Sequence, residues 1–362
     1  MTSTRRGLAL PAALFTIAII VLFIAGSAFT AAQEARAAHG TLSERIALEA
    51  AEYGATAVLR DWRRAWNVSV AIGQSVGPLT HTLSGGATAA VRLTRISATT
   101  WWVVSDGSVG TVASRKARRV VNAVLRLDLP PATPDAALAV IDSASVSGTG
   151  LVNGGDSLEV AGICGALPFV PTAGVAAPDT TRVSGLAGIA GTPPLASDST
   201  VAPRWLSLDS LLVADIVLPA GAVVTPMPVA SGSACDTTVL TNWGDPAGGA
   251  CGSWLPVIRA AGDVTLRGGR AQGILVADGD IVLENGAQFS GLVMPRDDLA
   301  GGAGGGTVLG AVIALDARRG AGDHTVVSSG TLLRRSSCRV LRARYGAAMP
   351  IRVTQRWWAE FE

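Results

Sequence analysis

Lysine and histidine are scarce in this sequence. Lys116 is the only lysine among 29 basic residues, and the three histidines, His39, His81 and His324, lie far apart. Three scattered histidines do not form a metal-binding pattern, so we expect no metal site and no cofactor. Only 15% of the residues are charged, and the formal net charge is +2. This balance excludes the strongly basic surface typical of proteins that bind nucleic acid.

Candidate catalytic residues are equally few. His324 follows Asp323, but no recognisable nucleophile motif accompanies them. Clustered carboxylates on a stack of strands could bind calcium or cleave sugars, and four candidates are present: Asp278, Asp280, Asp297 and Asp298. Aspartates also recur in turns because their side chains bond nearby backbone groups, and we favour that explanation. We therefore expect no catalytic residues and no enzyme.

What is abundant is apolar sequence and glycine. Apolar residues make up 49% of the chain, and 43 residues are glycine. One hydrophobic span does not account for this composition, so the remainder should be sheet rich in small and β-branched residues, with many turns. The expected fold class is mainly β with one long N-terminal α-helix.

The N-terminus contains the longest apolar run. Arg5 and Arg6 precede an uncharged stretch over residues 7–33. As a helix this stretch measures about 40 Å, which exceeds the roughly 30 Å of bilayer hydrocarbon. The two arginines orient it with the N-terminus in the cytoplasm and the bulk of the chain outside. A cleaved secretory signal, with Ala25-Gly26-Ser27-Ala28 as its cleavage site, and a twin-arginine signal are the alternatives.

The residues around Gly7 resemble a known leader. The run Arg5-Arg6-Gly7-Leu8-Ala9-Leu10-Pro11-Ala12 is similar to the leader of type IV pilin-like proteins, most closely the minor pilins named for the PilX N-terminal domain. The resemblance implies that a prepilin peptidase cuts between Gly7 and Leu8, and that the helix remains as an anchor in the bacterial inner membrane. Most pilins have a glutamate five residues after this glycine, whereas this chain has Ala12, which leaves filament incorporation open.

The following residues extend this helix. An apolar stripe recurs every three or four residues at Leu48, Ala51, Ala55, Val58, Trp62 and Trp66. It predicts an amphipathic helix up to residue 66, packed on a sheet as in pilins; an ordinary juxtamembrane helix is the alternative. Alternating segments at 67–72, 89–95, 100–105 and 117–127 predict that sheet, and its Trp-Val-Val-Ser and Ala-Arg-Arg motifs also resemble PilX-like proteins.

The last third contains a repeat. Gly273, Gly291, Gly310 and Gly330 each begin a mostly apolar tetrapeptide, at spacings of 18, 19 and 20 residues. Such a period predicts a β-solenoid, in which successive coils stack strands in parallel. Antiparallel hairpins that turn at Asp278-Gly279 and Asn285-Gly286 are the alternative. This region, including Gln272-Gly273-Ile274-Leu275-Val276, also resembles the C-terminal part of uncharacterised PilX-like envelope proteins.

Four cysteines in an exported chain permit two disulfides. Cys235 and Cys251 close a short polar loop without a core, which favours their pairing and leaves Cys164 with Cys338. The sequence does not fix this connectivity. The basic tail, including Arg334, Arg335, Arg339, Arg342 and Arg344, could bind an acidic glycan or an acidic partner, but a solvated outer face is the simpler interpretation.

Six segments follow from these patterns. They are a leader at 1–7, a transmembrane and amphipathic helix at 8–66, a small antiparallel β head at 67–129, a Pro-rich linker at 130–135, and a β-solenoid at 136–362 with a long loop insertion at 161–250. The expected function is a minor pilin or pilus-assembly subunit, with other pilins, prepilin peptidase and the lipid bilayer as partners. The alternative is an anchored β-solenoid that binds cell-surface polysaccharide outside any filament.

Overall fold

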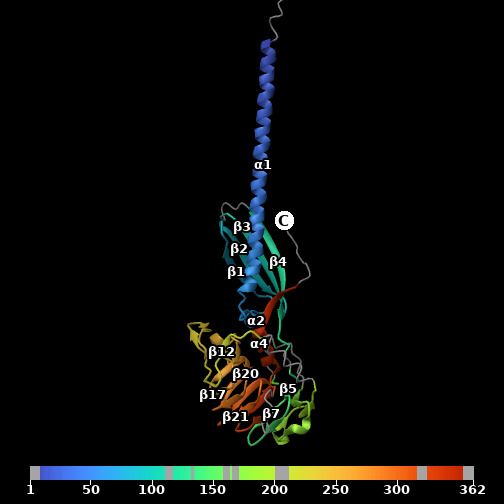
Figure 1. Cartoon of the computed structure of the whole chain (residues 1–362), viewed down its shortest axis with the longest axis vertical. Helices are drawn as coiled ribbons and strands as arrows, with labels where there is room; N and C mark the ends of the chain where they lie inside the picture. Colours follow the sequence, from blue (N-terminus) through green and yellow to red (C-terminus); the bar gives the residue numbers. More distant parts are fainter. Residues whose placement is uncertain are drawn as a thin grey trace, which may run out of the picture.

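A long helix, an antiparallel sheet and a set of parallel sheets succeed one another along the molecule (Figure 1). The computed structural model describes residues 9–110, 117–131, 134–157, 164, 171–199, 212–315 and 324–353. The long helix is α1 (Ala9–Arg60). Its first part extends away from the remainder, and its last part lies against the antiparallel sheet.

The antiparallel sheet, here called the head, has the order β1-β2-β3-β4-β25. Its strands are β1 (Ser75–Thr82), β2 (Ala87–Arg95), β3 (Thr100–Val109), β4 (Ala117–Asp128) and β25 (Met349–Arg352). The predicted helix and antiparallel sheet are thus both present. The helix is shorter than predicted: it ends at Arg60, and a short α2 (Trp66–Ser69) follows. The strand predicted at 67–72 is wrong, because α2 takes up its first residues and the first strand begins at Ser75. The fifth strand comes from the far end of the chain and has no counterpart in the predicted head.

Small residues set the distance between α1 and the head. Ala47, Ala50 and Ala51 are fully buried against the sheet. A Cβ atom added at Gly107 of β3 would lie 2.0 Å from the carbonyl oxygen of Ala47. One added at Gly54 of α1 would lie 2.7 Å from the Cβ of Ala89. The helix can therefore rest almost directly on the strand backbone, in the way that small residues permit for close helix contacts.

Strands of the C-terminal region run in parallel and in register. They include β16 (Val257–Ala260), β18 (Arg270–Ala277), β20 (Ala287–Pro295) and β22 (Gly306–Ala314). Gly273 pairs with Gly291, and Gly291 pairs with Gly310. The parallel direction predicted for the first three repeats is confirmed, and the antiparallel hairpin alternative is wrong for these strands.

The fourth repeat is not in the predicted position. Gly310 pairs with Arg335 of β24 (Leu332–Arg335), so Gly330 does not continue the glycine column. The physical reason is that another strand occupies this position. The C-terminal half of β22 pairs with β5 (Ala136–Val140), which comes from a much earlier part of the chain.

A second parallel sheet alternates with the first. Its order is β13-β17-β19-β21-β23-β6-β9. Strands β17 (Val264–Arg267), β19 (Ile281–Glu284) and β21 (Leu299–Gly301) each follow a strand of the first sheet along the chain. The other strands are β13 (Ala222–Val224), β23 (Thr325–Val327), β6 (Ala144–Val146) and β9 (Val183–Ser184). We call these two sheets together the parallel stack. The segment 161–250, expected to form loops, also contributes strands: β8 (Ala173–Ala177) pairs with β5, and β12 (Ile216–Leu218) pairs with β16.

Both faces of the first parallel sheet are buried. Leu275, Val293 and Val312 belong to the core inside the parallel stack. Ile274, Leu292 and Ala311 point to the opposite face and belong to a second cluster with Val340 and Ala343 of α4 (Ser337–Ala347). The helix α4 therefore covers the outer apolar face, which explains why these strands are almost continuously apolar.

The glycine column has a backbone explanation. Gly291 and Gly310 have φ values of 139° and 147°, in a region that residues with a side chain rarely adopt. A Cβ at Gly291 would lie 2.1 Å from the oxygen of Gly273, and one at Gly310 would lie 1.8 Å from the oxygen of Gly291. Each glycine thus allows its strand to bend directly over the preceding one.

The interior position of Val293 gives a stability prediction. Val293→Asp places an unpaired carboxylate in the core of the parallel stack, so we expect a loss of about 4 kcal/mol or more in the free energy of unfolding, or failure to fold. Gln288→Asp, at an exposed position of the same strand, is the control and should change stability little. Chemical denaturation followed by circular dichroism measures both, and equal stability of the two variants would contradict the assigned face.

Candidate functional site

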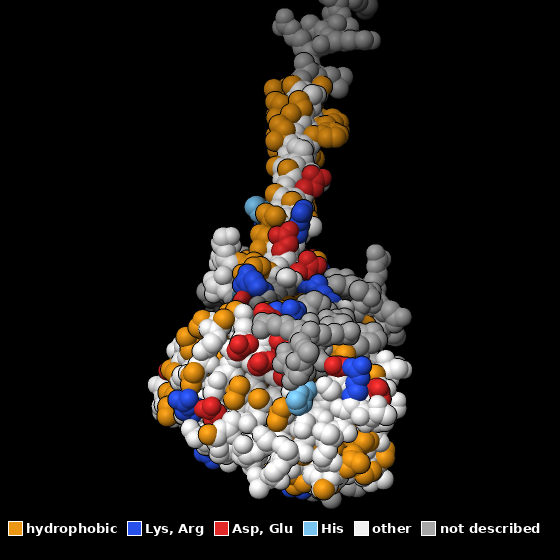
Figure 2. Space-filling view, turned by 60° about the horizontal axis from the view of Figure 1, so that its bottom comes forward, with side chains coloured by type: hydrophobic (Ala, Val, Ile, Leu, Met, Phe, Trp, Pro, Cys, Tyr) orange, Lys and Arg blue, Asp and Glu red, His pale blue; other side chains and the backbone are white. Residues whose placement is uncertain are grey.

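The most distinctive surface of the molecule is the exposed part of α1. Every residue from 10 to 42 is exposed, and we call this segment the stalk. Large apolar side chains cover it, among them Phe15, Ile20, Leu22 and Phe23. Figure 2 shows hydrophobic side chains along the outer part of the stalk and charged ones near its base. An apolar surface of this size in water requires a lipid or protein partner.

The stalk has the dimensions of a membrane span. Residues 10–33 contain no charge and form about 36 Å of helix, against roughly 30 Å of hydrocarbon. Within the described residues, α1 is the one helix long and apolar enough to cross a bilayer. Glu34 and Arg36 are the first charges, and burial against the head begins near Ala47. The structure is therefore compatible with a single-pass anchor joined to the head by a short exposed helical neck.

The residues predicted to determine processing and membrane orientation cannot be placed on the stalk. Arg5, Arg6, Gly7 and Leu8 lie outside the described residues. Ala12, which replaces the usual pilin glutamate, lies on the exposed surface of the stalk. The predicted cleavage between Gly7 and Leu8 thus remains a prediction.

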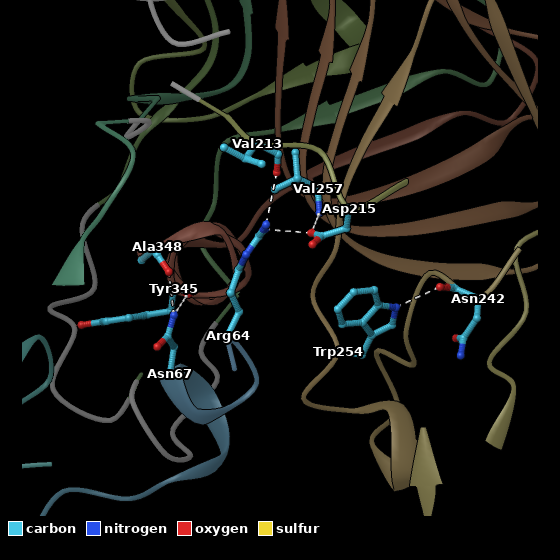
Figure 3. Close-up of polar contacts among 9 residues, drawn as sticks. All are labelled: Arg64, Asn67, Val213, Asp215, Asn242, Trp254, Val257, Tyr345 and Ala348. Atoms are coloured by element: carbon cyan, nitrogen blue, oxygen red, sulfur yellow. Dashed lines mark hydrogen bonds and ion pairs between the residues drawn. The ribbon is translucent and has the colours of Figure 1, made fainter. Parts of the chain in front are cut away.

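A second feature is the junction between the head and the parallel stack (Figure 3). Arg64, just after α1, donates from Nη1 to Asp215 Oδ2 at 2.8 Å, and both side chains are only 17% exposed. Asp215 Oδ2 also accepts from the backbone N–H of Val257 at 2.8 Å. Burial raises the pKa of the Asp215 carboxyl, and the Arg64 charge and the Val257 N–H oppose this increase.

Asn67 makes a second connection at the junction. Its buried Nδ2 donates to the carbonyl oxygens of Tyr345 at 2.7 Å and Ala348 at 3.0 Å, and its Oδ1 accepts from Trp62 Nε1 at 2.9 Å. These carbonyls lie at the C-terminal end of α4, where the helix itself supplies no donors. Asn67 therefore joins the end of α1 to the end of α4.

Buried arginine stabilises the head core. Arg95 is fully buried and donates to the carbonyl oxygens of Val70, Ser97 and Ala98. Its guanidinium also lies over the rings of Trp101 and Tyr345, at 5.7 and 5.5 Å from their centroids. Burial lowers the pKa of Arg95, but an arginine remains protonated despite such a decrease.

Four arginines of the basic tail do not lie on a solvated outer face, whereas Arg334 is exposed. Arg339, Arg342 and Arg344 donate to the carbonyl oxygens of Pro246, Gly252 and Pro130. Arg335 is 6% exposed, and burial lowers its pKa. These arginines attach α4 and the preceding strand to surrounding loops, so the interpretation as a solvated face is wrong for them. Arg356 and the two following tryptophans lie outside the described residues.

The carboxylates of the parallel stack bond its backbone. Asp263 Oδ1 accepts from the N–H of Asp280, and Asp280 Oδ1 accepts from the N–H of Asp298, both at 3.0 Å. Thr325 Oγ1 donates to Asp298 Oδ1 at 3.1 Å. These bonds join residues 17 to 27 positions apart, so they connect neighbouring strands of the stack and are not the local turn contacts that the sequence suggested. Among the described residues, no group of three or more His, Cys, Asp or Glu side chains is arranged to hold a metal ion.

The four cysteines form two disulfides. Cys235 is bonded to Cys251, and Cys164 is bonded to Cys338, the two pairs that the sequence favours. The first closes a loop in which Asn242 Nδ2 donates to the carbonyl oxygens of Val229 and Asp236. The carbonyl of Asn242 in turn accepts from Trp254 Nε1 at 3.0 Å (Figure 3). The second disulfide attaches the first turn of α4.

Comparison with known proteins does not assign this chain to a family. No protein-family model matches the chain, and no curated protein matches it. Among solved structures, the chain is similar to the crystal structure of the competence-associated pilin ComZ from Thermus thermophilus. The identity is 10%, the alignment covers 89% of this chain and 97% of that chain, and the TM-score is 0.23. At this identity and TM-score the likeness supports no conclusion about this chain.

The stalk gives a prediction about membrane association. Leu22→Arg places a charge near the middle of the apolar segment, which costs about 2.5–3.5 kcal/mol on insertion scales. We expect less protein in the membrane fraction after cell lysis and carbonate washing. Leu42→Arg, at an exposed leucine nearer the head, is the matched control and should remain in that fraction. Equal membrane recovery of both variants would contradict the anchor.

The junction gives a prediction about pH. A carboxyl with a raised folded-state pKa holds its proton more tightly when folded, so its ionisation lowers stability as the pH rises from the unfolded pKa through the folded one. Arg64→Ala removes the cation that opposes this loss. We expect it to destabilise the protein by about 1–3 kcal/mol at pH 7 and by less at pH 4, where Asp215 takes up its proton.

Thermal denaturation at the two pH values measures this difference. Arg60→Ala is the control, because the Arg60–Asp61 pair is exposed and lies at the end of α1, four residues before Arg64. It should change the melting temperature little at either pH. A loss for Arg64→Ala that is as large at pH 4 as at pH 7 would show that ionised Asp215 is not the cause.

Proposed function

We propose that this protein is a membrane-anchored minor pilin or pilus-assembly subunit of a type IV pilus-like system. The observation that carries the proposal is the division of α1: an exposed apolar half, and a half packed through alanine and glycine onto an antiparallel sheet. The leader-like residues around Gly7 support it. The PilX-like sequence motifs of the head and of the C-terminal region also support the proposal.

The same stalk surface suits both a membrane and a filament. In lipid, an uncharged apolar helix is stable as a monomer. In a filament, it packs against the equivalent helices of neighbouring subunits, which cover its apolar side chains. Ala12 provides no carboxylate to pair with the amino terminus of a neighbour. This favours a subunit that starts, ends or decorates a filament over one repeated throughout it.

We further infer that the parallel stack is a β-solenoid. Its strands run in parallel, neighbouring strands are in register, and the chain alternates between two sheets. In Figure 1 the stack lies at the end of the molecule opposite the N-terminal end of α1. A large body in that position projects away from the membrane, as expected for the exposed tip of an assembly.

The processing test separates this proposal from a secretory signal. The mature chain should begin at Leu8, and Gly7→Glu should block cleavage because the peptidase site accepts a small residue there. Gly40→Glu, in the exposed neck, is the control and should be cleaved normally. Mass spectrometry of the membrane-extracted protein reads the N-terminus. An intact Met1, or a start near Ser27 or Gln33, would contradict the proposal.

The assembly test follows the protein into filaments. Filaments sheared from cells should contain the wild-type chain and lack the Gly7→Glu variant, since an uncleaved subunit stays in the membrane. Immunoblotting of sheared and cell-bound fractions gives the comparison. A wild-type chain that is correctly cleaved but absent from the filaments and their assembly complexes would favour an anchored protein outside any filament.

A further inference from the structure

A half-open cavity lies on the outer face of the first parallel sheet. Its volume is about 210 Å³, and its lining comes from three neighbouring strands, the turn at Pro246 and Ala247, and Arg339 in the first turn of α4. The strand residues are Arg270 of β18, Gln288, Phe289 and Ser290 of β20, and Thr307 and Leu309 of β22. This cavity is separate from both the stalk and the junction.

Strand register places its polar groups in a row. Arg270 pairs with Gln288, and Gln288 pairs with Thr307, so the three side chains succeed one another at about 4.8 Å intervals across the sheet. Ala271, Phe289 and Val308 belong to the core of the parallel stack. Because side chains alternate along a strand, their neighbours on either side point outward, toward the cavity.

Two of these groups lack partners in the described chain. Ser290 is 3% exposed, and its hydroxyl has no hydrogen-bond partner although it lines the cavity. Buried polar groups are almost always bonded, so this hydroxyl is available to bond a group that enters the cavity. The Arg270 side chain is exposed and forms no ion pair or hydrogen bond among the described residues. The row therefore offers an unpaired cation beside a hydroxyl and an amide.

We propose that this cavity binds one acidic sugar unit of a polysaccharide. The Arg270 guanidinium pairs with the sugar carboxylate, the partner that its planar donors match best. Gln288, Ser290 and Thr307 each donate and accept, as the ring hydroxyls of a sugar also do. Leu309 and Pro246 provide apolar contact for the C–H face of the ring.

An acidic peptide fits this surface less well. Extended peptides are recognised through backbone hydrogen bonds at an open sheet edge. The cavity floor is instead the face of three strands whose backbone groups already pair with one another. Recognition must therefore use side chains, and the available ones are uncharged hydroxyl and amide groups beside arginine. The proposal does not depend on filament assembly and would hold for an anchored protein outside a pilus.

Binding of oligogalacturonate to the full chain in detergent micelles tests the proposal. Isothermal titration calorimetry should show binding that weakens with added salt, and a neutral dextran of equal length should not bind. Arg270→Gln should weaken binding about ten-fold or more, and Ser290→Ala about three- to ten-fold, because each removes one bond to the ligand. Arg126→Gln, at an exposed position of the head sheet, is the charge-matched control and should bind like the wild type.

Three outcomes would overturn the proposal. Wild-type affinity in both Arg270→Gln and Ser290→Ala, with unchanged circular dichroism, would remove the cavity from the binding site. An equal loss in Arg126→Gln would indicate attraction to overall charge. Binding of polyglutamate as tight as that of oligogalacturonate would point to an acidic peptide. Ser290→Ala removes only one unbonded hydroxyl and leaves the rest of the side chain in place, so it tests the site even where the arginine variant fails to fold.

Discussion

The return of the chain from the parallel stack to the head is the constraint on which the whole architecture depends. Residues 337–352 form α4, which covers the apolar outer face of three parallel strands, and then β25, which completes the antiparallel sheet beside β4. Asn67 bonds the carbonyls between these two elements. Arg344 reaches the carbonyl of Pro130 where the chain leaves the head. Each half of the protein therefore contains a piece without which the other half exposes apolar surface or an unpaired edge.

The contribution of the C-terminal segment to the head helps to explain how a small sheet can fix the position of the stalk. The α1 contact uses alanine and glycine, which bury little area per residue but permit a very short distance. The aromatic core at its lower end adds the larger side chains: Trp62 packs edge-on against Trp101 at 5.3 Å, and Tyr345 from α4 joins the same cluster. The position of the stalk is thus linked, through Tyr345, to residues that cover the parallel stack.

Local patterns were enough to predict much of this fold. The uncharged run at 7–33, the helical stripe after Thr41, strands β2, β3 and β4 of the head and the first three glycine repeats follow from periodicity and turn chemistry within short windows. The fourth repeat was predicted wrongly because the partner of residues 312–314 is the strand 138–140, a pairing that no local pattern contains. For the same reason β25 was missed: four residues near Met349 indicate nothing about β4.

The features of the candidate site also fall into those that local sequence predicts and those that it does not. The stalk was readable from composition, since lipid-facing helices require only uninterrupted apolar sequence. The arginines of the basic tail were not predictable, because an arginine bonded to carbonyls and a free exposed one have the same sequence signature. Arg335 is buried, and the half-buried Arg342 donates to the carbonyl of Gly252. The cavity beside Ser290 depends on register across three strands and on α4, and neither is set by nearby residues.

The pairing of β5 with β22 and of β4 with β25 also governs the order in which the protein can be completed during synthesis. A ribosome adds roughly 5–20 residues per second, so residues 136–140 emerge on the order of ten seconds before their partners at 312–314 exist. The edge of β4 waits longer still, for residues 349–352. During that interval both strand edges are open to association with other chains. The edge of β5 is therefore covered once residues 312–314 have been made, whereas the edge of β4 stays open until β25 is available.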